Sequence, residues 1–201
     1  GYSVTAKGFR MAQAFSEDSS SVSGKGYDTA KFIDRAGAAD TFQSDPTLAY
    51  MTGSSYWLDA KMFDVVEGTS SDGLDKARLY DSGYGADTFT FVATTKTGEI
   101  KGANQVLINN QPLVHTFDGK ATGFKTLNVY GAKKTPGADV ATLTGTTGND
   151  VFAADALWGG GVLTGTGYYV NVSFFETINA VGNGGVDVAR LRDTAGNDAF
   201  T

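Results

Sequence analysis

One stretch decides the fold class of this chain: Asp75-Lys76-Ala77-Arg78-Leu79-Tyr80-Asp81, followed after a short turn by Asp87-Thr88-Phe89. The same pattern, D-x-A-x-[LF]-x-[DG] and then D-x-F, occurs four times in the 201 residues. Such self-similarity is the signature of a repeat protein, in which each copy is one structural unit. The other copies are residues 28–34 with 40–42, 139–145 with 150–152, and 187–193 with 198–200.

Apolar and polar residues alternate within each copy, which is the two-residue period of a β-strand. In the quoted stretch, Ala77 and Leu79 therefore share the face that we expect to be buried. Asp and Gly at both ends of the pattern favour turns, so each copy predicts a strand with a turn on either side. The side chains expected in the core are Phe32, Leu79, Leu143, Leu191, Phe42, Phe89, Phe152, Phe63, Phe124 and Phe175.

A second element separates the copies: an aromatic residue, six further residues, a phenylalanine, and apolar residues three and five positions later. Its phenylalanines are Phe9, Phe63, Phe124 and Phe175. Near-identical units predict an all-β fold, a parallel β-solenoid (β-helix or β-roll) of about four repeats, whose D-x-A-x-L strands stack on one another. The alternative is a β-sandwich, which the regular spacing of turns also fits but which gives no reason for near-identical units.

The four copies begin 47, 64 and 48 residues apart. Coils of about 16 residues or of about 24 both fit these spacings, and the second choice makes residues 94–110 a protruding hairpin. We interpret residues 1–201 as a single repetitive domain and, because both ends fall within the pattern, as a fragment of a longer chain. Its units are approximately 1–27 (partial), 28–74, 75–138 with an insertion near 94–110, 139–186, and 187–201 (partial).

Composition narrows the function classes. The chain has 27 glycines, 22 acidic residues of which 18 are Asp, and a net charge of −6. An acidic surface repels phosphate backbones, so we expect no nucleic-acid partner. Cysteine is absent, which excludes a disulfide framework and thiolate metal sites. No apolar run approaches the ~20 residues of a membrane helix, so no membrane insertion is expected.

The unit D-x-A-x-L-x-D-x-x-G-x-D-x-F, together with the F-x-x-φ-x-A element, resembles the tandem repeats of very long secreted bacterial surface proteins. The resemblance covers essentially all of residues 1–201 and implies an extracellular or cell-surface location. Those proteins have no assigned activity to carry over. A weaker resemblance to the calcium-binding repeats of RTX proteins, without their nine-residue tandem spacing, rests on Gly145-Thr146-Thr147-Gly148-Asn149-Asp150-Val151-Phe152 and Gly196-Asn197-Asp198-Ala199-Phe200.

The aspartates at the strand ends are the densest set of candidate ligands, and calcium is the one cofactor that they predict. Ca²⁺ takes six to eight oxygens, which carboxylates and turn carbonyls supply. The alternative is that each aspartate accepts N–H bonds of its own turn. Both interpretations stay open, and Gly145 stands where the other copies have Asp. The predicted calcium corners are Asp28, Asp34, Asp40, Asp75, Asp81, Asp87, Asp139, Asp150, Asp187, Asp193 and Asp198.

No catalytic residue is predicted, and we expect the chain not to be an enzyme. The one histidine, His115, and the lack of cysteine exclude zinc enzymes and Cys–His hydrolases. A carboxylate pair for sugar cleavage would interrupt the repeat rather than follow it. The aromatic pairs Tyr56-Trp57 and Tyr168-Tyr169 fall at matching points, either as core stacks or, if exposed, as a stripe that binds sugars.

We therefore expect a structural or adhesive module of a stalk, sheath, surface layer or fibre. Its expected partners are copies of itself or neighbouring repeats, joined end to end, because solenoid ends present unpaired strand edges. Polysaccharide is the second expected partner, and the alternative function is a carbohydrate-binding or carbohydrate-active β-helix module.

Overall fold

The computed structural model describes residues 9–16, 28–72, 74–108, 111–132 and 139–195. These residues form the strands β1 to β17, and no helix occurs among them. The predicted all-β class is thus confirmed. Within the described ranges, no helix is present that has the length and apolar character needed to cross a membrane.

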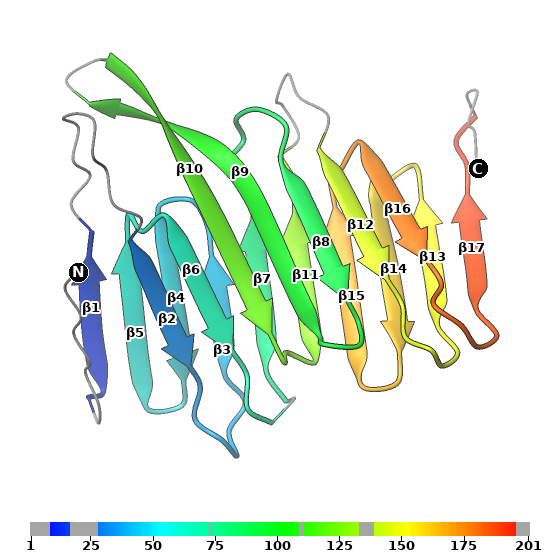
Figure 1. The fold of residues 1–201 in the computed structure, drawn as a ribbon, viewed down its shortest axis with the longest axis horizontal. Coiled ribbons are helices and arrows are strands. Elements are labelled where there is room, and N and C mark those ends of the chain that lie inside the picture. Colours follow the sequence, from blue (N-terminus) through cyan, green and yellow to red (C-terminus); the bar gives the residue numbers. More distant parts are fainter. Residues whose placement is uncertain (1–8, 17–27, 73, 109–110, 133–138, 196–201) are drawn as a thin grey trace.

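The strands form two mixed sheets whose inner faces pack on each other (Figure 1). Sheet A has the order β1-β5-β4-β3-β7-β11-β15-β14-β13-β17, and sheet B has the order β2-β6-β10-β9-β8-β12-β16. The strands of sheet A are β1 (Met11–Phe15), β3 (Thr41–Ser44), β4 (Leu48–Gly53), β5 (Tyr56–Lys61), β7 (Lys76–Tyr80), β11 (Thr126–Tyr130), β13 (Val151–Asp155), β14 (Gly160–Gly165), β15 (Tyr168–Ser173) and β17 (Val188–Arg192). Those of sheet B are β2 (Thr29–Ile33), β6 (Val65–Thr69), β8 (Thr88–Val92), β9 (Thr97–Ile108), β10 (Gln111–Thr122), β12 (Val140–Thr144) and β16 (Thr177–Val181).

The chain path combines sheet crossings with three-stranded antiparallel meanders. A single strand in one sheet is followed by a single strand in the other, and then by a meander in the first sheet. The meanders are β3-β4-β5, β8-β9-β10 and β13-β14-β15. Each meander runs backwards along its sheet, so that its last strand pairs in parallel with an earlier strand: β5 with β1, β10 with β6, and β15 with β11.

The four D-x-A-x-L segments do not stack on one another, and this part of the prediction is wrong. They form β2 and β12 in sheet B and β7 and β17 in sheet A. Each pairs in parallel with strands of the other motifs; β7, for example, lies between β3 and β11. The reason is that successive units place the same motif in opposite sheets. The architecture therefore has the crossings expected of a solenoid and the antiparallel hairpins expected of a sandwich.

The inserted residues of the second meander lengthen a hairpin. Strands β9 and β10 each have 12 residues, whereas β4, β5, β14 and β15 each have 6. Only 97–101 of β9 pair with β8, and only 118–122 of β10 pair with β6. The remaining paired residues extend the hairpin past its neighbours, as Figure 1 shows.

The core lies between the sheets, where side chains from the predicted strand faces meet. Phe42 of β3 is fully buried, with its ring centroid 5.8 Å from Phe32 of the opposite sheet and 5.9 Å from Phe124. Of the ten predicted core residues, seven are buried, while Phe63 and Phe152 are partly buried against the core. Leu191 differs, because 44% of it is exposed. The seven buried residues are Phe32, Phe42, Leu79, Phe89, Leu143, Phe124 and Phe175.

The repeat phenylalanine follows a backbone corner at which the chain changes sheets. The residue before it has a positive φ: 62° at Met62, 83° at Gly123 and 67° at Phe174. The N–H of each of these residues donates to the carbonyl before the middle strand of the preceding meander, at Thr47, Lys96 and Gly159 respectively. A left-handed residue turns the chain sharply, and this bond ties the corner to the meander.

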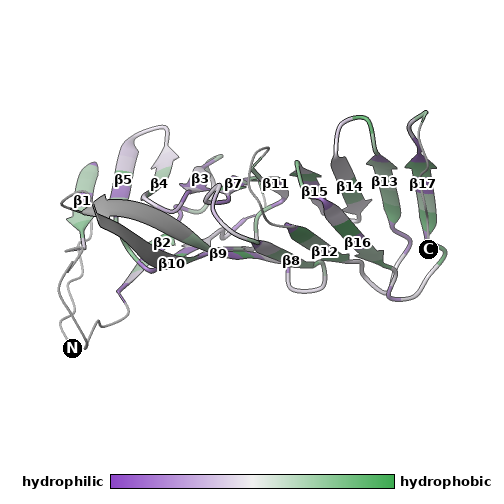
Figure 2. Ribbon diagram, turned by 90° about the horizontal axis from the view of Figure 1, so that it is seen from above, coloured by the Kyte–Doolittle hydropathy of each residue, from purple (hydrophilic) through white to green (hydrophobic). Residues whose placement is uncertain are grey.

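The two sheets do not end together at the C-terminal end. Sheet A continues through β14, β13 and β17, whereas sheet B stops at β16, as Figure 2 shows. An open groove of about 970 Å³ lies there, lined on the apolar side by Phe152, Leu163, Ile178, Ala189 and Leu191. These are inward-facing positions of the repeat, so the groove is a continuation of the core.

Candidate functional site

Acidic residues stand directly before almost every strand that follows a sheet crossing. We call their side chains the strand-start carboxylates. The exception among the described crossings is Lys125 before β11. Six of the nine carboxylates are buried, which is unusual for aspartate. The nine are Asp28, Asp40, Asp64, Asp75, Asp87, Asp139, Asp150, Glu176 and Asp187.

Hydrogen bonds link the strand-start carboxylates across parallel strand pairs. The N–H of Asp40 donates to Oδ1 of Asp75 at 2.7 Å, and the N–H of Asp87 donates to Oδ1 of Asp139 at 2.8 Å. Each carboxylate thus receives the first N–H of the neighbouring strand. A carboxylate that accepts a backbone N–H makes one of the stronger hydrogen bonds of proteins. The same bond joins Asp28 to Asp64, Asp139 to Glu176, and Asp150 to Asp187.

The aspartate of each D-x-F motif also closes the turn that leads to it. The second oxygen of Asp40 accepts the N–H of Arg35 at 3.1 Å, and that of Asp87 accepts the N–H of Ser82 at 3.1 Å. The interpretation of these aspartates as acceptors for turn N–H groups is therefore supported by the geometry. What sequence reasoning missed is that the aspartates also bridge to the next unit.

One carboxylate cluster joins Asp34, which follows β2, to the loop that precedes β7. Oxygens of Asp34, Asp72 and Asp75 lie within 4.8 Å of one another. Burial raises the pKa of Asp75 to about 6, and the neighbouring Asp34 adds to this rise. Burial also acts to raise the pKa of Asp34, but interactions with Asp75 and with Ser71 outweigh it, so that the pKa of Asp34 is lowered.

An equivalent cluster forms one crossing later, from Asp81, Asp87 and Asp139, again with oxygens within 4.8 Å. Asp139 is fully buried, and Asp87 is 1% exposed. Burial raises the pKa of Asp81 to about 7; the N–H of Gly83 opposes the rise, and Asp139 adds to it. The pKa of Asp87 is also raised, chiefly by burial. The cluster therefore gathers more negative charge than its surroundings readily stabilise.

The third crossing of this kind lacks one carboxylate. Gly145 stands at the position of Asp34 and Asp81, and a β-carbon there would lie 2.5 Å from Asp150. Oδ1 of Asp150 instead accepts the hydroxyl of Tyr168 at 2.9 Å, and Oδ2 accepts the N–H of Thr146. Burial and this carboxylate together raise the pKa of Tyr168. The protein itself supplies the hydrogen-bond partners here.

The remaining predicted corner residues are not gathered into a cluster. Asp28 is exposed and accepts the Ser16 hydroxyl at 2.7 Å, and Asp193 is exposed after β17. Asp187 is exposed and accepts the N–H of Asp150. Asp198 lies outside the described residues. The structure thus brings Asp34 together with Asp75, and Asp81 with Asp139, across units rather than within one.

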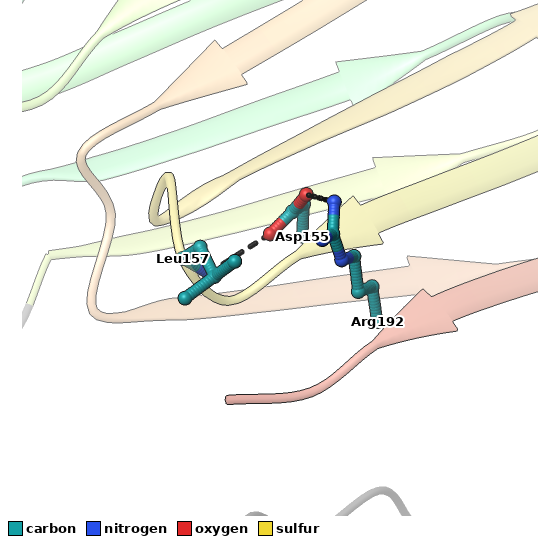
Figure 3. Close-up of polar contacts among 3 residues, drawn as sticks. All are labelled: Asp155, Leu157 and Arg192. Atoms are coloured by element: carbon teal, nitrogen blue, oxygen red, sulfur yellow. Dashed lines mark hydrogen bonds and ion pairs between the residues drawn. The ribbon is translucent and has the colours of Figure 1, made fainter. Parts of the chain in front are cut away.

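Aspartates also hold the hairpin turns of the meanders. Asp155 at the end of β13 accepts the N–H of Leu157 at 2.9 Å, and its other oxygen lies 3.3 Å from the Arg192 guanidinium of β17 (Figure 3). Asp45 caps the β3–β4 turn through N–H bonds from Thr47 and Leu48. Both carboxylates lie at the C-terminal ends of strands, so the repeat motif alone did not identify them.

The aromatic pairs divide between the core and the surface. Tyr168 is buried, and Tyr56 is packed against the core, as one of the two interpretations predicts. Trp57 and Tyr169 point the other way and are 40% and 41% exposed. On the outer face of sheet A, Trp57 stacks on Tyr50 at 4.6 Å, and Tyr80 stacks on Tyr130 at 4.8 Å.

Comparison of this chain with protein-family models, with curated proteins and with solved structures finds no match. The functional argument therefore depends on the geometry of the two sheets, of their carboxylates and of their open end.

Proposed function

We propose that the chain is a structural or adhesive module of an extracellular repeat protein, a stretch of a two-sheet solenoid that joins further units end to end. One observation carries this proposal: the same motif position is covered inside the molecule and uncovered at its end. Leu79 and Leu143 are completely buried, whereas Leu191, at the same place in its copy, is 44% exposed.

The path of the chain defines what would cover the C-terminal groove. In every described unit, the D-x-A-x-L strand in one sheet is followed by a meander in the other: β2 by β3-β4-β5, β7 by β8-β9-β10, and β12 by β13-β14-β15. Strand β17 lies in sheet A, so this rule requires a meander in sheet B beside β16. The occupant that we propose for the groove is therefore a three-stranded meander of another unit of this repeat.

The edges of the sheets favour the same partner. Among the described residues, strands β16 and β17 each have one neighbour within their sheets, and no described strand pairs with the N–H and C=O groups on the other side of each. Such edges pair readily with further strands. Because Asp155 and Arg192 already hold β17 in parallel register, the free side of β17 is ordered for pairing. This geometry supports a function in extended assembly.

The test is the association state of the 201-residue chain. We expect light scattering and small-angle X-ray scattering to report elongated oligomers that grow with concentration. Leu191→Glu places a charge in the groove and should abolish this growth. The matched control is Val92→Glu, because Val92 is 40% exposed but lies at the outer face of sheet B, and this variant should associate normally. A chain that stays monomeric at all concentrations, or equal effects of both variants, would refute the proposal.

The aromatic stacks on sheet A support a second candidate function, contact with polysaccharide. Trp57 on β5 and Tyr169 on β15 are both partly exposed, and the Tyr80–Tyr130 stack on β7 and β11 lies on strands between them. Aromatic faces contribute strongly to burial of apolar ligand surface. We expect retention on insoluble polysaccharide to fall at least several-fold in Trp57→Ala, while Trp158→Ala, in the β13–β14 turn, serves as the control for a lost exposed tryptophan. No retention of the wild type would exclude this candidate.

A further inference from the structure

The Asp81–Asp87–Asp139 cluster contains a carboxylate oxygen that the protein does not satisfy. Among the described residues, Oδ2 of Asp139 is buried and has no hydrogen-bond partner. Oδ1 of the same group accepts the N–H of Asp87 at 2.8 Å. An anionic oxygen that is buried without a partner is destabilising unless a proton or a cation lies against it.

The neighbours of the Asp139 carboxylate are themselves carboxylates. One oxygen from each of Asp81, Asp87 and Asp139 lies within 4.8 Å of the other two, and within the described part of the chain no lysine or arginine pairs with any of the three. Asp81 accepts the N–H groups of Gly83 and Ala132, and Asp87 accepts that of Ser82. These N–H bonds fix the orientation of the flanking carboxylates without neutralising three charges.

We propose that Asp81, Asp87 and Asp139 bind one calcium ion, which joins one unit of the repeat to the next. The ligand set is made only of oxygens and is rich in carboxylates, which suits a hard divalent cation, and calcium accepts the irregular geometry of such a set. Asp81 and Asp87 flank the loop between β7 and β8, whereas Asp139 precedes β12 of the following unit. A cation there would therefore connect segments more than 50 residues apart.

The crossing at Gly145 provides an internal comparison. It has Asp150 and Asp187 at the places of Asp87 and Asp139, but glycine at the place of Asp81. At that crossing, Tyr168 and Thr146 satisfy the oxygens of Asp150. Among the described residues, each of the two three-carboxylate clusters contains a buried oxygen without a partner, at Asp34 and at Asp139, and such oxygens also occur at Asp40 and Asp118, whereas Asp150 has none.

The experiment compares Asp139→Asn with the matched control Asp187→Asn. Asparagine keeps the oxygen that accepts the N–H of Asp87 and replaces the unpartnered oxygen with an amide nitrogen, so the fold should be retained, as far-UV circular dichroism will show. After removal of cations with a chelator, CaCl₂ is titrated at pH 7.5 by calorimetry and by thermal unfolding. At a hundred times the Kd, the wild type should gain about 5–10 °C in Tm.

We expect Asp139→Asn to bind one calcium ion fewer than the wild type and to lose most of the gain in Tm, while Asp187→Asn keeps both. If the variant fails to fold, Asp81→Asn gives the same comparison from a partly exposed residue. The proposal is overturned if CaCl₂ leaves the Tm of the wild type unchanged, or if both variants respond to calcium as the wild type does. If CaCl₂ does not change the Tm of the wild type, and Asp139→Asn is more stable than the wild type without metal, then a proton and not a cation bridges the carboxylates.

Discussion

Phe42 is the residue at which the packing of the two sheets is easiest to quantify. Its fully buried ring contacts the rings of Phe32 and Phe124. We expect Phe42→Ala to lower the free energy of unfolding by about 3–5 kcal/mol, because the cavity would lie between two sheets that cannot close over it. Urea denaturation measures this change. The control is Phe15→Ala, since Phe15 is 65% exposed and should cost below about 1 kcal/mol; similar losses for both would contradict the assigned packing.

Individual carboxyl groups set the pH dependence of the calcium-free protein. The pKa values of Asp75 and Asp81 are raised to about 6 and about 7, in both cases chiefly by burial. The folded chain therefore holds these protons more tightly than the unfolded chain, and their stabilising contribution is present at about pH 4 and lost as the pH rises to about 7. In a chelator, Tm should fall over this interval. Asp81→Asn should flatten the upper part of the fall, and a Tm that instead rises with pH through this interval would contradict the assignment.

Two strands that carry the same sequence motif are buried to different extents. β7 and β17 carry the same motif, yet Leu79 is fully buried and Leu191 is half exposed. We expect Leu79→Ala to cost about 2–5 kcal/mol and Leu191→Ala about 1 kcal/mol or less, as measured by denaturant unfolding at a concentration at which the chain is monomeric. Equal costs would mean that the terminal strand is covered within the monomer.

The sequence predicts where the strands occur and which of their side chains point inward, but it does not predict which strands pair. The alternation in residues 75–81 correctly predicted that Ala77 and Leu79 point inward, because a two-residue period is a local property of the backbone. The sheet to which β7 belongs depends on the sheet crossings that precede it, such as the corner at Met62, and on a meander that runs backwards, and these are non-local features. The positive φ before the repeat phenylalanine left a signal at Gly123, but Met62 and Phe174 stand at the equivalent positions and conceal it.

The sequence predicted the type of residue that forms the candidate site, but not which aspartates lie together. Aspartates at strand ends were expected to cluster; Asp34 lies with Asp75, and Asp81 lies with Asp87 and Asp139, whereas the other described ones are not gathered. Their grouping across units follows from register, since Asp40 is the parallel neighbour of Asp75, and Asp87 that of Asp139. Register between distant segments has no signature within a single repeat copy, so the sequence suggested groups within units instead.

For the whole molecule, stability should be distributed between neighbouring units. Terminal strand β17 contributes exposed residues and one parallel pairing with β13. We therefore expect a chain shortened to residues 1–181 to keep its β-type circular dichroism and to lose at most about 5 °C in Tm, as nearest-neighbour coupling in repeat proteins implies. A scanning calorimetry trace without a cooperative transition would show that β17 is instead required for the fold.

The backward-running meanders also have a mechanical consequence. Meanders occupy sheet A, then sheet B, then sheet A along the long axis (Figure 1). Because the chain crosses between the sheets on either side of each meander, the two sheets are tied together by covalent connections along their whole described length. A tensile load along the axis would therefore be shared by the hydrogen-bonded strand pairs of both sheets and by the chain segments that connect them.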